Sequence, residues 1–224
     1  MPGARPDTKV EPDSAARIRG YRPSDRPRVR HICHATGYMG EPIDWAWSDV
    51  ESFADMYCGY YTDHEPENIS LVEQDGQVTG YLLGCVDTRR AASSTAVAAR
   101  HALGRLLLLR PGTASFLWRA VADLLRGGWR QERFDPRWPA HLHIDLLPAA
   151  RGSGAGRRLM ERWMARLGEL RVPGVHLGTF HENRPAVAFF QRLGFRVHGD
   201  PVQAPGFRTR AGAPMHSQLM VREL

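Results

Sequence analysis

The chain has 224 residues, of which 42% are hydrophobic and 24% charged, and a net charge of +6 at pH 7. These values are ordinary for a soluble globular protein with one domain and a sizeable core. The sequence lacks an apolar run of about 18 residues and an apolar segment near its start, so we expect no membrane span and no secretory leader.

The cysteines and the distribution of charge indicate the redox compartment of the protein and the classes of partner that it can bind. Cys33, Cys58 and Cys85 are odd in number and lack metal-ligand spacing. We therefore expect free thiols in a reducing, cytoplasmic compartment. The basic residues are scattered along the chain and form no stripe, so we expect neither nucleic acid nor membrane as a partner.

The first part of the chain predicts a short strand and two helices. Residues 1–16 are polar and Pro-rich and are expected to be a disordered tail, followed by a single domain over 17–224. A strand is predicted at 18–21 and a helix from Asp25 to about 35. A second helix is predicted over 49–60, with Phe53, Met56 and Tyr57 on its buried face.

A hairpin and a helical insert follow. Asp75-Gly76 is a strong turn signal between two predicted strands, 70–74 and 78–86. Residues 88–137 contain two apolar segments, 91–109 and 116–125, that predict helices. This insert could cap a cleft, add to an acceptor site, form a homodimer contact or join the core.

The most informative stretch is a strand, a glycine turn and a helix. His141, His143 and Asp145 alternate with apolar residues, which is typical of a strand, and Pro148 ends it. Three glycines lie between 152 and 156, and apolar residues then recur at helical spacing to 168. The first amides of such a helix, together with its dipole, form an anion site.

The turn fits Arg/Gln-x-x-Gly-x-Gly/Ala through Arg151, Gly154 and Gly156, and lacks the P-loop pattern. It resembles the acetyl-CoA pyrophosphate loop of the GNAT acyltransferases. A second block, Asn183 to Phe195, resembles the Asn-x-x-Ala-x-x-Phe-Tyr element of that family. The sequence of residues 141–148 and 174–177 also resembles the acetyltransferase-like domain of O-GlcNAcase and its stand-alone bacterial relatives.

This resemblance implies an α+β GNAT fold, in which a mixed, mostly antiparallel sheet is flanked by helices. It also implies acetyl-CoA as cosubstrate, with the Leu146 amide as a candidate donor to the thioester oxygen. The residues expected to hold acetyl-CoA are Leu146, Leu147, Arg151, Gly152, Ser153, Gly154, Ala155, Gly156, Arg157, Asn183, Ala186 and Phe189.

Two residues are the catalytic candidates, because polar groups on the central strand reach the cleft in this family. Asp145 is the first choice for the general base or amine orienter, with His143 beside it; a merely structural role for Asp145 is equally open. His141, His143 and Asp145 also fit a metal triad, but no further ligand with recognisable spacing follows, so no metal is expected.

The largest departure from the family pattern is Phe190, which stands where a tyrosine often protonates the CoA thiolate. Phenylalanine cannot donate a proton, so another group must serve or the activity is weak. The sequence thus predicts an N-acetyltransferase that acetylates an unidentified amine by direct attack in a ternary complex. The alternative is a weak or inactive pseudo-acetyltransferase that acts as a CoA-binding or interaction module.

Overall fold

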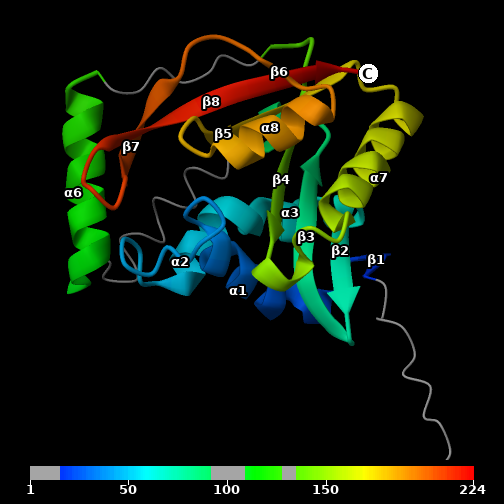
Figure 1. Cartoon of the computed structure of the whole chain (residues 1–224), viewed down its shortest axis with the longest axis horizontal. Coiled ribbons are helices and arrows are strands. Elements are labelled where there is room, and N and C mark those ends of the chain that lie inside the picture. Colours follow the sequence, from blue (N-terminus) through cyan, green and yellow to red (C-terminus); the bar gives the residue numbers. More distant parts are fainter. Residues whose placement is uncertain (1–15, 92–108, 128–134) are drawn as a thin grey trace, which may run out of the picture.

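One sheet forms the frame of the protein, and the computed structural model describes it through residues 16–91, 109–127 and 135–224. In these ranges the strand order is β1-β2-β3-β4-β5-β8-β6, with β7 paired to β8 beside them (Figure 1). Neighbouring strands are antiparallel except β4 and β5, as the predicted mixed sheet requires. The strands are β1 (Arg17–Gly20), β2 (Ile69–Gln74), β3 (Gln77–Cys85), β4 (Ala140–Leu146), β5 (Gly174–Phe180), β6 (Arg196–Val197), β7 (Val202–Arg208) and β8 (Pro214–Glu223).

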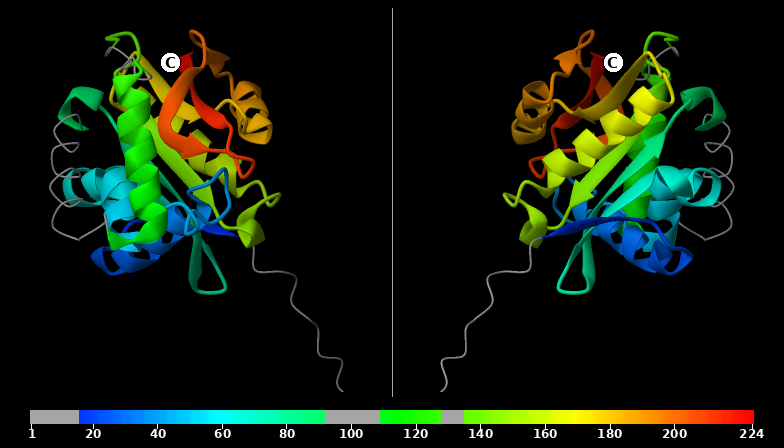
Figure 2. Two further views of the ribbon diagram at one scale, coloured as in Figure 1. Left: turned by 90° about the vertical axis from the view of Figure 1, so that its left-hand side faces the viewer. Right: turned by 90° about the vertical axis from the view of Figure 1, so that its right-hand side faces the viewer.

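Helices cover both faces of the sheet (Figures 1 and 2). One face carries α1 (Arg26–Thr36), α2 (Val50–Ala54), the π-helical turn η2 (Asp55–Gly59) and α3 (Tyr60–His64). The other face carries α7 (Ala155–Glu169) and α8 (Arg184–Arg192). Because alternate side chains of a strand point to opposite faces, Leu142 of β4 faces α7, whereas His143 and Asp145 face the α1–α3 segment.

The second predicted helix forms but differs from a regular α-helix. It continues to His64 and contains the π-helical turn η2, which adds a residue to one turn and rotates the side chains that follow. Phe53 is buried as predicted, and Cys58 is fully buried. The prediction that Met56 is buried is wrong, because the widened turn leaves this side chain 39% exposed.

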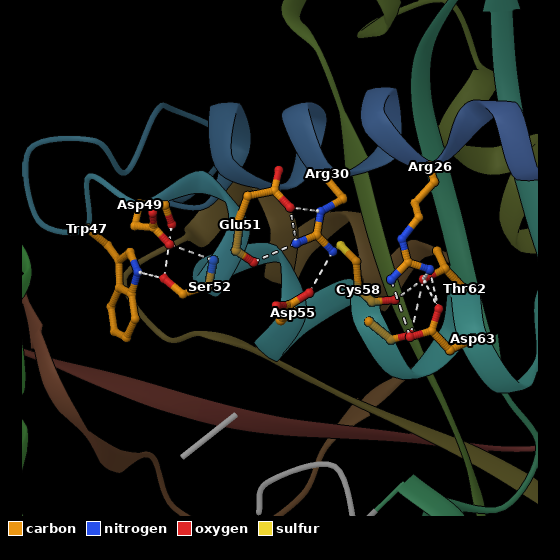
Figure 3. Close-up of polar contacts among 11 residues, drawn as sticks. Arg26, Arg30, Trp47, Asp49, Glu51, Ser52, Asp55, Cys58, Thr62 and Asp63 are labelled. Atoms are coloured by element: carbon orange, nitrogen blue, oxygen red, sulfur yellow. Dashed lines mark hydrogen bonds and ion pairs between the residues drawn. The ribbon is translucent and has the colours of Figure 1, made fainter. Parts of the chain in front are cut away.

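Ion pairs fix the α2–α3 segment against α1 (Figure 3). Arg30 is buried, with its Nε 2.8 Å from Glu51 Oε2 and its Nη1 2.7 Å from Asp55 Oδ1. Arg26 pairs with Asp63 farther along the same helices. Removing both carboxylates would leave the buried charge of Arg30 uncompensated, so its two ion pairs hold η2 against α1, whereas the Arg26–Asp63 pair is exposed.

The described part of the predicted insert supports the C-terminal strands. It forms α4 (Thr88–Ala91) and α6 (Pro111–Leu125), and α6 runs alongside β7 (Figure 2). Asp123 accepts from the Gly206 amide at 2.9 Å and from Arg208 at 2.7 Å. The phenyl rings of Phe116 and Phe207 lie 4.9 Å apart. Strand β7 was not predicted.

Two predictions fall on residues outside the described ranges. The tail expected at 1–16 lies there except for Ala16, and the helix expected at 91–109 lies there except for its two end residues. In the ranges that are described, no helix combines the length and the apolar character that a bilayer crossing requires.

Candidate active site

The parallel strands β4 and β5 separate after two residue pairs. Ala140 pairs with Val175 and His141 with His176, and in the described strands the pairing stops there. A cavity of about 340 Å³ occupies the gap and extends to α1 and α8. Residues 142–145 and 177–180 line its two sides. An open gap between strands offers backbone groups with which an extended ligand can pair.

The backbone of β4 presents alternate amides to this gap. The Leu147 amide donates to the Thr79 carbonyl at 2.8 Å, which continues the ladder with β3. Because inward and outward amides alternate along an antiparallel pair, the Leu146 amide points away from β3 and toward the gap. The Leu146 amide is therefore available to a ligand in the gap, whereas the Leu147 amide is hydrogen-bonded within the sheet; contact of either residue with the cosubstrate stays a prediction.

The glycine turn forms a cradle beyond the C-terminal end of β4, the end at which β4 is not paired with β5. Gly152 and Gly154 have φ angles of +75° and +76°, a left-handed conformation that disfavours other residues. A Cβ at either position would meet no described atom within 4 Å, so the space above the turn is open. Helix α7 begins directly after it at Ala155, with its dipole directed at the turn.

The amides of this turn suit an anionic ligand. Among the described residues, no backbone acceptor engages the amides of Gly152, Ser153, Gly154, Gly156 and Arg157. The Ser153 hydroxyl is occupied, because it donates to the Ala150 carbonyl at 2.8 Å. Unpaired amides at the start of a 15-residue helix make a site for phosphate oxygens.

Gly156 has a packing role within the same loop. A Cβ there would lie 3.2 Å from Leu146 Cδ1 and 3.4 Å from the Phe189 ring. The absence of a side chain therefore lets α7 approach β4 and α8 closely. Ala155 is buried beside it.

The side chains of the two arginines in the loop are engaged within the protein. The Arg151 Nε donates to the Leu146 carbonyl at 3.0 Å, and its Nη2 contacts the Gly40 carbonyl. Arg157 pairs with Glu161 at 2.7 Å on the exposed face of α7. No local pattern indicates that two carbonyls flank Arg151, so this bridge between the loop and residue 40 could not be predicted.

Asp145 and His143 lie together in the cavity, as predicted from their alternation on β4. His143 Nε2 is 3.4 Å from Asp145 Oδ2, and the Tyr81 hydroxyl donates to the same oxygen at 2.6 Å. Burial raises the pKa of Asp145, and the charge of His143 and the hydrogen bond from Tyr81 only partly oppose this. Burial disfavours the charged form of His143, but Asp145 and the Cys58 sulfur outweigh it and raise the pKa of His143 to about 9.

These shifts assign different forms to the two residues. A histidine with a raised pKa carries a proton at neutral pH, so His143 is the cation of the pair. Burial raises the pKa of Asp145, which brings it closer to the value that suits a general base near neutral pH.

Three residues that lie near the pair were assigned no role in the site from the sequence. Tyr81 of β3 lies directly opposite Asp145 in the sheet register. Cys58 Sγ is 3.8 Å from the Tyr81 hydroxyl, and the Tyr57 ring lies 6.0 Å from the His143 ring. The pairing of β3 with β4 spans the insert, so no turn signal in the sequence could have revealed Tyr81.

The second sequence block lines the opposite side of the cavity. Asn183 caps α8 by accepting from the Ala186 amide at 3.3 Å, and both residues face the cavity. Phe190 also lines it and packs between the rings of Phe189 and Phe195, at 5.2 and 5.9 Å. This side of the cavity thus presents an amide and apolar rings.

His141 is separated from the other two polar residues of β4. Its Nδ1 lies 2.8 Å from the Thr88 hydroxyl, and its ring is 5.6 Å from that of His176. Burial, with the neighbouring His176 and His143, lowers the pKa of His141 to about 3. Over the described ranges, no group of three His, Cys, Asp or Glu side chains has a metal-binding arrangement.

Comparison with known proteins identifies the class. Residues 35–195 match the model of the acetyltransferase (GNAT) family. The crystal structure of SsHAT is 31% identical, with a TM-score of 0.67, and the match covers 94% of this chain and 98% of that chain. The chain belongs to the GNAT acetyltransferase family.

More distant structures share the fold. The ribosomal-protein-S18-alanine N-acetyltransferase of Escherichia coli is 16% identical with a TM-score of 0.53, and the match covers 93% of each chain. A phosphinothricin acetyltransferase from Sinorhizobium meliloti, solved with acetyl-CoA, is 17% identical with a TM-score of 0.57, over 94% of this chain and 89% of that chain. These likenesses confirm the predicted GNAT fold.

Proposed function

We propose that this protein is an acetyl-CoA-dependent N-acetyltransferase that acetylates an amine by direct attack in a ternary complex. The separation of β4 from β5 carries the proposal, because Asp145 lines the cavity in this gap and the glycine turn follows the same, unpaired end of β4. Membership of a family of acetyltransferases supports it. A relative of the same fold has been solved with acetyl-CoA.

The amides of the glycine turn supply the binding of the diphosphate. The residues assigned to this part are Gly152, Ser153, Gly154, Ala155, Gly156 and Arg157, with Arg151 beside them. The Leu146 amide, directed into the gap, is assigned to the thioester oxygen, where negative charge develops during attack. Asn183, Ala186 and Phe189 are assigned to the pantetheine arm.

Asp145 is assigned the proton of the attacking amine. The amine nitrogen forms a bond to the carbonyl carbon, the carbon–sulfur bond breaks, and Asp145 accepts the proton that the nitrogen loses. The imidazolium of His143 stabilises the carboxylate before the transfer. Phe190 offers no proton to the departing thiolate. The thiolate is therefore protonated by water, or it leaves as the anion because the CoA thiol is acidic enough.

Phe190 also favours the second candidate, a CoA-binding module of weak or no activity. Its ring lies at the cavity wall where the family often has a tyrosine. The open glycine cradle is as compatible with an active enzyme as with a binding module, because both must hold CoA. The acceptor, a homodimer and the narrower relationship to the O-GlcNAcase domain remain predictions.

The test is acetyl transfer by the purified chain, measured as release of free CoA thiol over a panel of amines. The panel includes small amines, aminosugars, peptide N-termini and lysine peptides. The proposal expects turnover with at least one class and loss of turnover in Asp145→Asn. Tight binding of acetyl-CoA without turnover on the whole panel would instead support the binding module.

A further inference from the structure

Tyr81 is a buried residue that the proposed chemistry does not yet use. Its side chain is fully buried under the α1–α3 segment, and it lies outside the residues that line the cavity. Its hydroxyl nevertheless donates to Asp145 Oδ2 at 2.6 Å. It therefore cannot meet a substrate, but it can act through Asp145.

We infer that Tyr81 is a positioning residue, which fixes the Asp145 carboxylate and favours its ionised form. Tyr81 and His143 both contact Oδ2 of Asp145. Because they hold one oxygen from two strands, the other oxygen, Oδ1, is assigned to the amine proton. This inference rests on the proposed role of Asp145 as the base.

The surroundings of Tyr81 leave its hydroxyl with little freedom. The ring packs 5.9 Å from the His143 ring, and register pairing places its backbone opposite Asp145. The thiols near the hydroxyl, Cys58 with its Sγ at 3.8 Å and Cys33, are weak partners. A buried hydroxyl needs a hydrogen bond, and the bond to a carboxylate is the strongest available here.

The hydrogen bond opposes the effect of burial on Asp145. The groups that act on this carboxyl are Tyr81 on β3, His143 on β4, Thr36 on α1 and Arg151 after η5 (Pro148–Ala150). Cys33 and Cys58 face Tyr81 from α1 and η2. Since a hydrogen bond to the charged form favours ionisation, removing the Tyr81 hydroxyl raises the pKa of Asp145 further.

The experiment compares Tyr81→Phe with the matched control Tyr60→Phe. Tyr60 also donates a hydroxyl to a carboxylate, Glu65 at 2.8 Å, and does not line the cavity that Asp145 lines. In Tyr81→Phe, we expect the acidic limb of the kcat/KM profile to move to higher pH by about one to two units. The rate at alkaline pH should be largely retained, and Tyr60→Phe should follow the wild type.

Other outcomes decide against the inference. A merely structural role would lower kcat/KM by one factor at every pH, without moving the limb, and would overturn it. A fluorinated tyrosine at position 81 keeps the ring and donates a stronger hydrogen bond, so the limb should move to lower pH. This second variant keeps the inference falsifiable if Tyr81→Phe does not fold.

A measurement independent of turnover separates this inference from the proposed function. Carbon-13 NMR of labelled aspartate follows the titration of the Asp145 carboxyl in the free protein. An upward shift in Tyr81→Phe supports the inference even if no amine is acetylated. An unchanged titration refutes it, whatever the activity.

Discussion

Replacing Asp145 with Asn tests the division of roles within the polar pair. Asn has the same shape, and its carbonyl oxygen can still accept the 2.6 Å hydrogen bond from Tyr81. The substitution removes the negative charge and the capacity to accept a proton. We therefore expect the fold to be preserved and the proton transfer to be lost.

The magnitude has two parts. Loss of a positioned base lowers kcat/KM by about 10²–10⁴-fold. The His143–Asp145 contact of 3.4 Å corresponds to about 5 kcal/mol at an effective dielectric constant of about 20, or between three and four pH units at most. The pKa of His143 should thus fall from about 9 to its ordinary value of ~6.5 or below, because burial then acts unopposed by Asp145.

Two measurements check this prediction on one variant. Steady-state kinetics give the loss in kcat/KM, and nitrogen-15 NMR follows the titration of the His143 ring. A pKa of His143 that stays near 9 would refute the electrostatic pairing. A kcat/KM within about threefold of the wild type would refute Asp145 as the base.

Three further predictions concern the cavity wall and the packing. Phe190→Tyr should raise kcat by about tenfold or more, because it supplies a proton donor at the cavity wall; equal turnover by stopped assay would show that no acid is needed there. Asp123→Asn should cost about 2–4 kcal/mol of unfolding free energy, since it leaves Arg208 without its buried partner. Arg208 lowers the pKa of Asp123 in the folded state, so the contribution of this pair to the unfolding free energy is present at neutral pH and is lost as the pH falls below about 4. Urea unfolding at several pH values should show this loss in the wild type and not in Asp123→Asn. Gly84→Ala should lower the unfolding free energy by about 1–3 kcal/mol, because its Cβ would lie 2.5 Å from the Trp163 ring. Gly20→Ala, which has open space around it, is the control, and equal stability of the two variants would contradict the packing.

Local signals predicted the framework of the site. The alternation on β4, the stop at Pro148 and the three glycines predicted the strand, the cradle and α7. In each case the relevant physics acts between residues close in sequence, where turn chemistry and periodicity are informative.

Contacts between distant segments were not predictable. Tyr81 meets Asp145 because β3 and β4 pair across the insert, at positions 64 residues apart in the sequence. Arg151 turns to the Gly40 carbonyl because the α1–α2 loop lies beside it in the fold. Both contacts depend on tertiary packing.

Two local errors have local causes. Met56 is exposed because η2 is π-helical, and the apolar periodicity of the sequence assumes a regular helix. Strand β7 contains Pro205 and Gly206, which usually mark a loop, and it is held by pairing with β8 and by α6. In both, the surrounding structure outweighs the intrinsic preference of the segment.

The central claim, that the turn before α7 grips acetyl-CoA, is tested most directly by titration calorimetry. We compare the wild type with Gly154→Leu and with Gly76→Leu, which carries a similar φ, +73° against +76°, and equally open surroundings in the β2–β3 turn. We expect one acetyl-CoA bound per wild-type chain, unchanged affinity in Gly76→Leu, and affinity at least about tenfold weaker in Gly154→Leu, where a side chain fills the cradle. No binding heat from the wild type, or equal affinity in all three proteins, would contradict the claim.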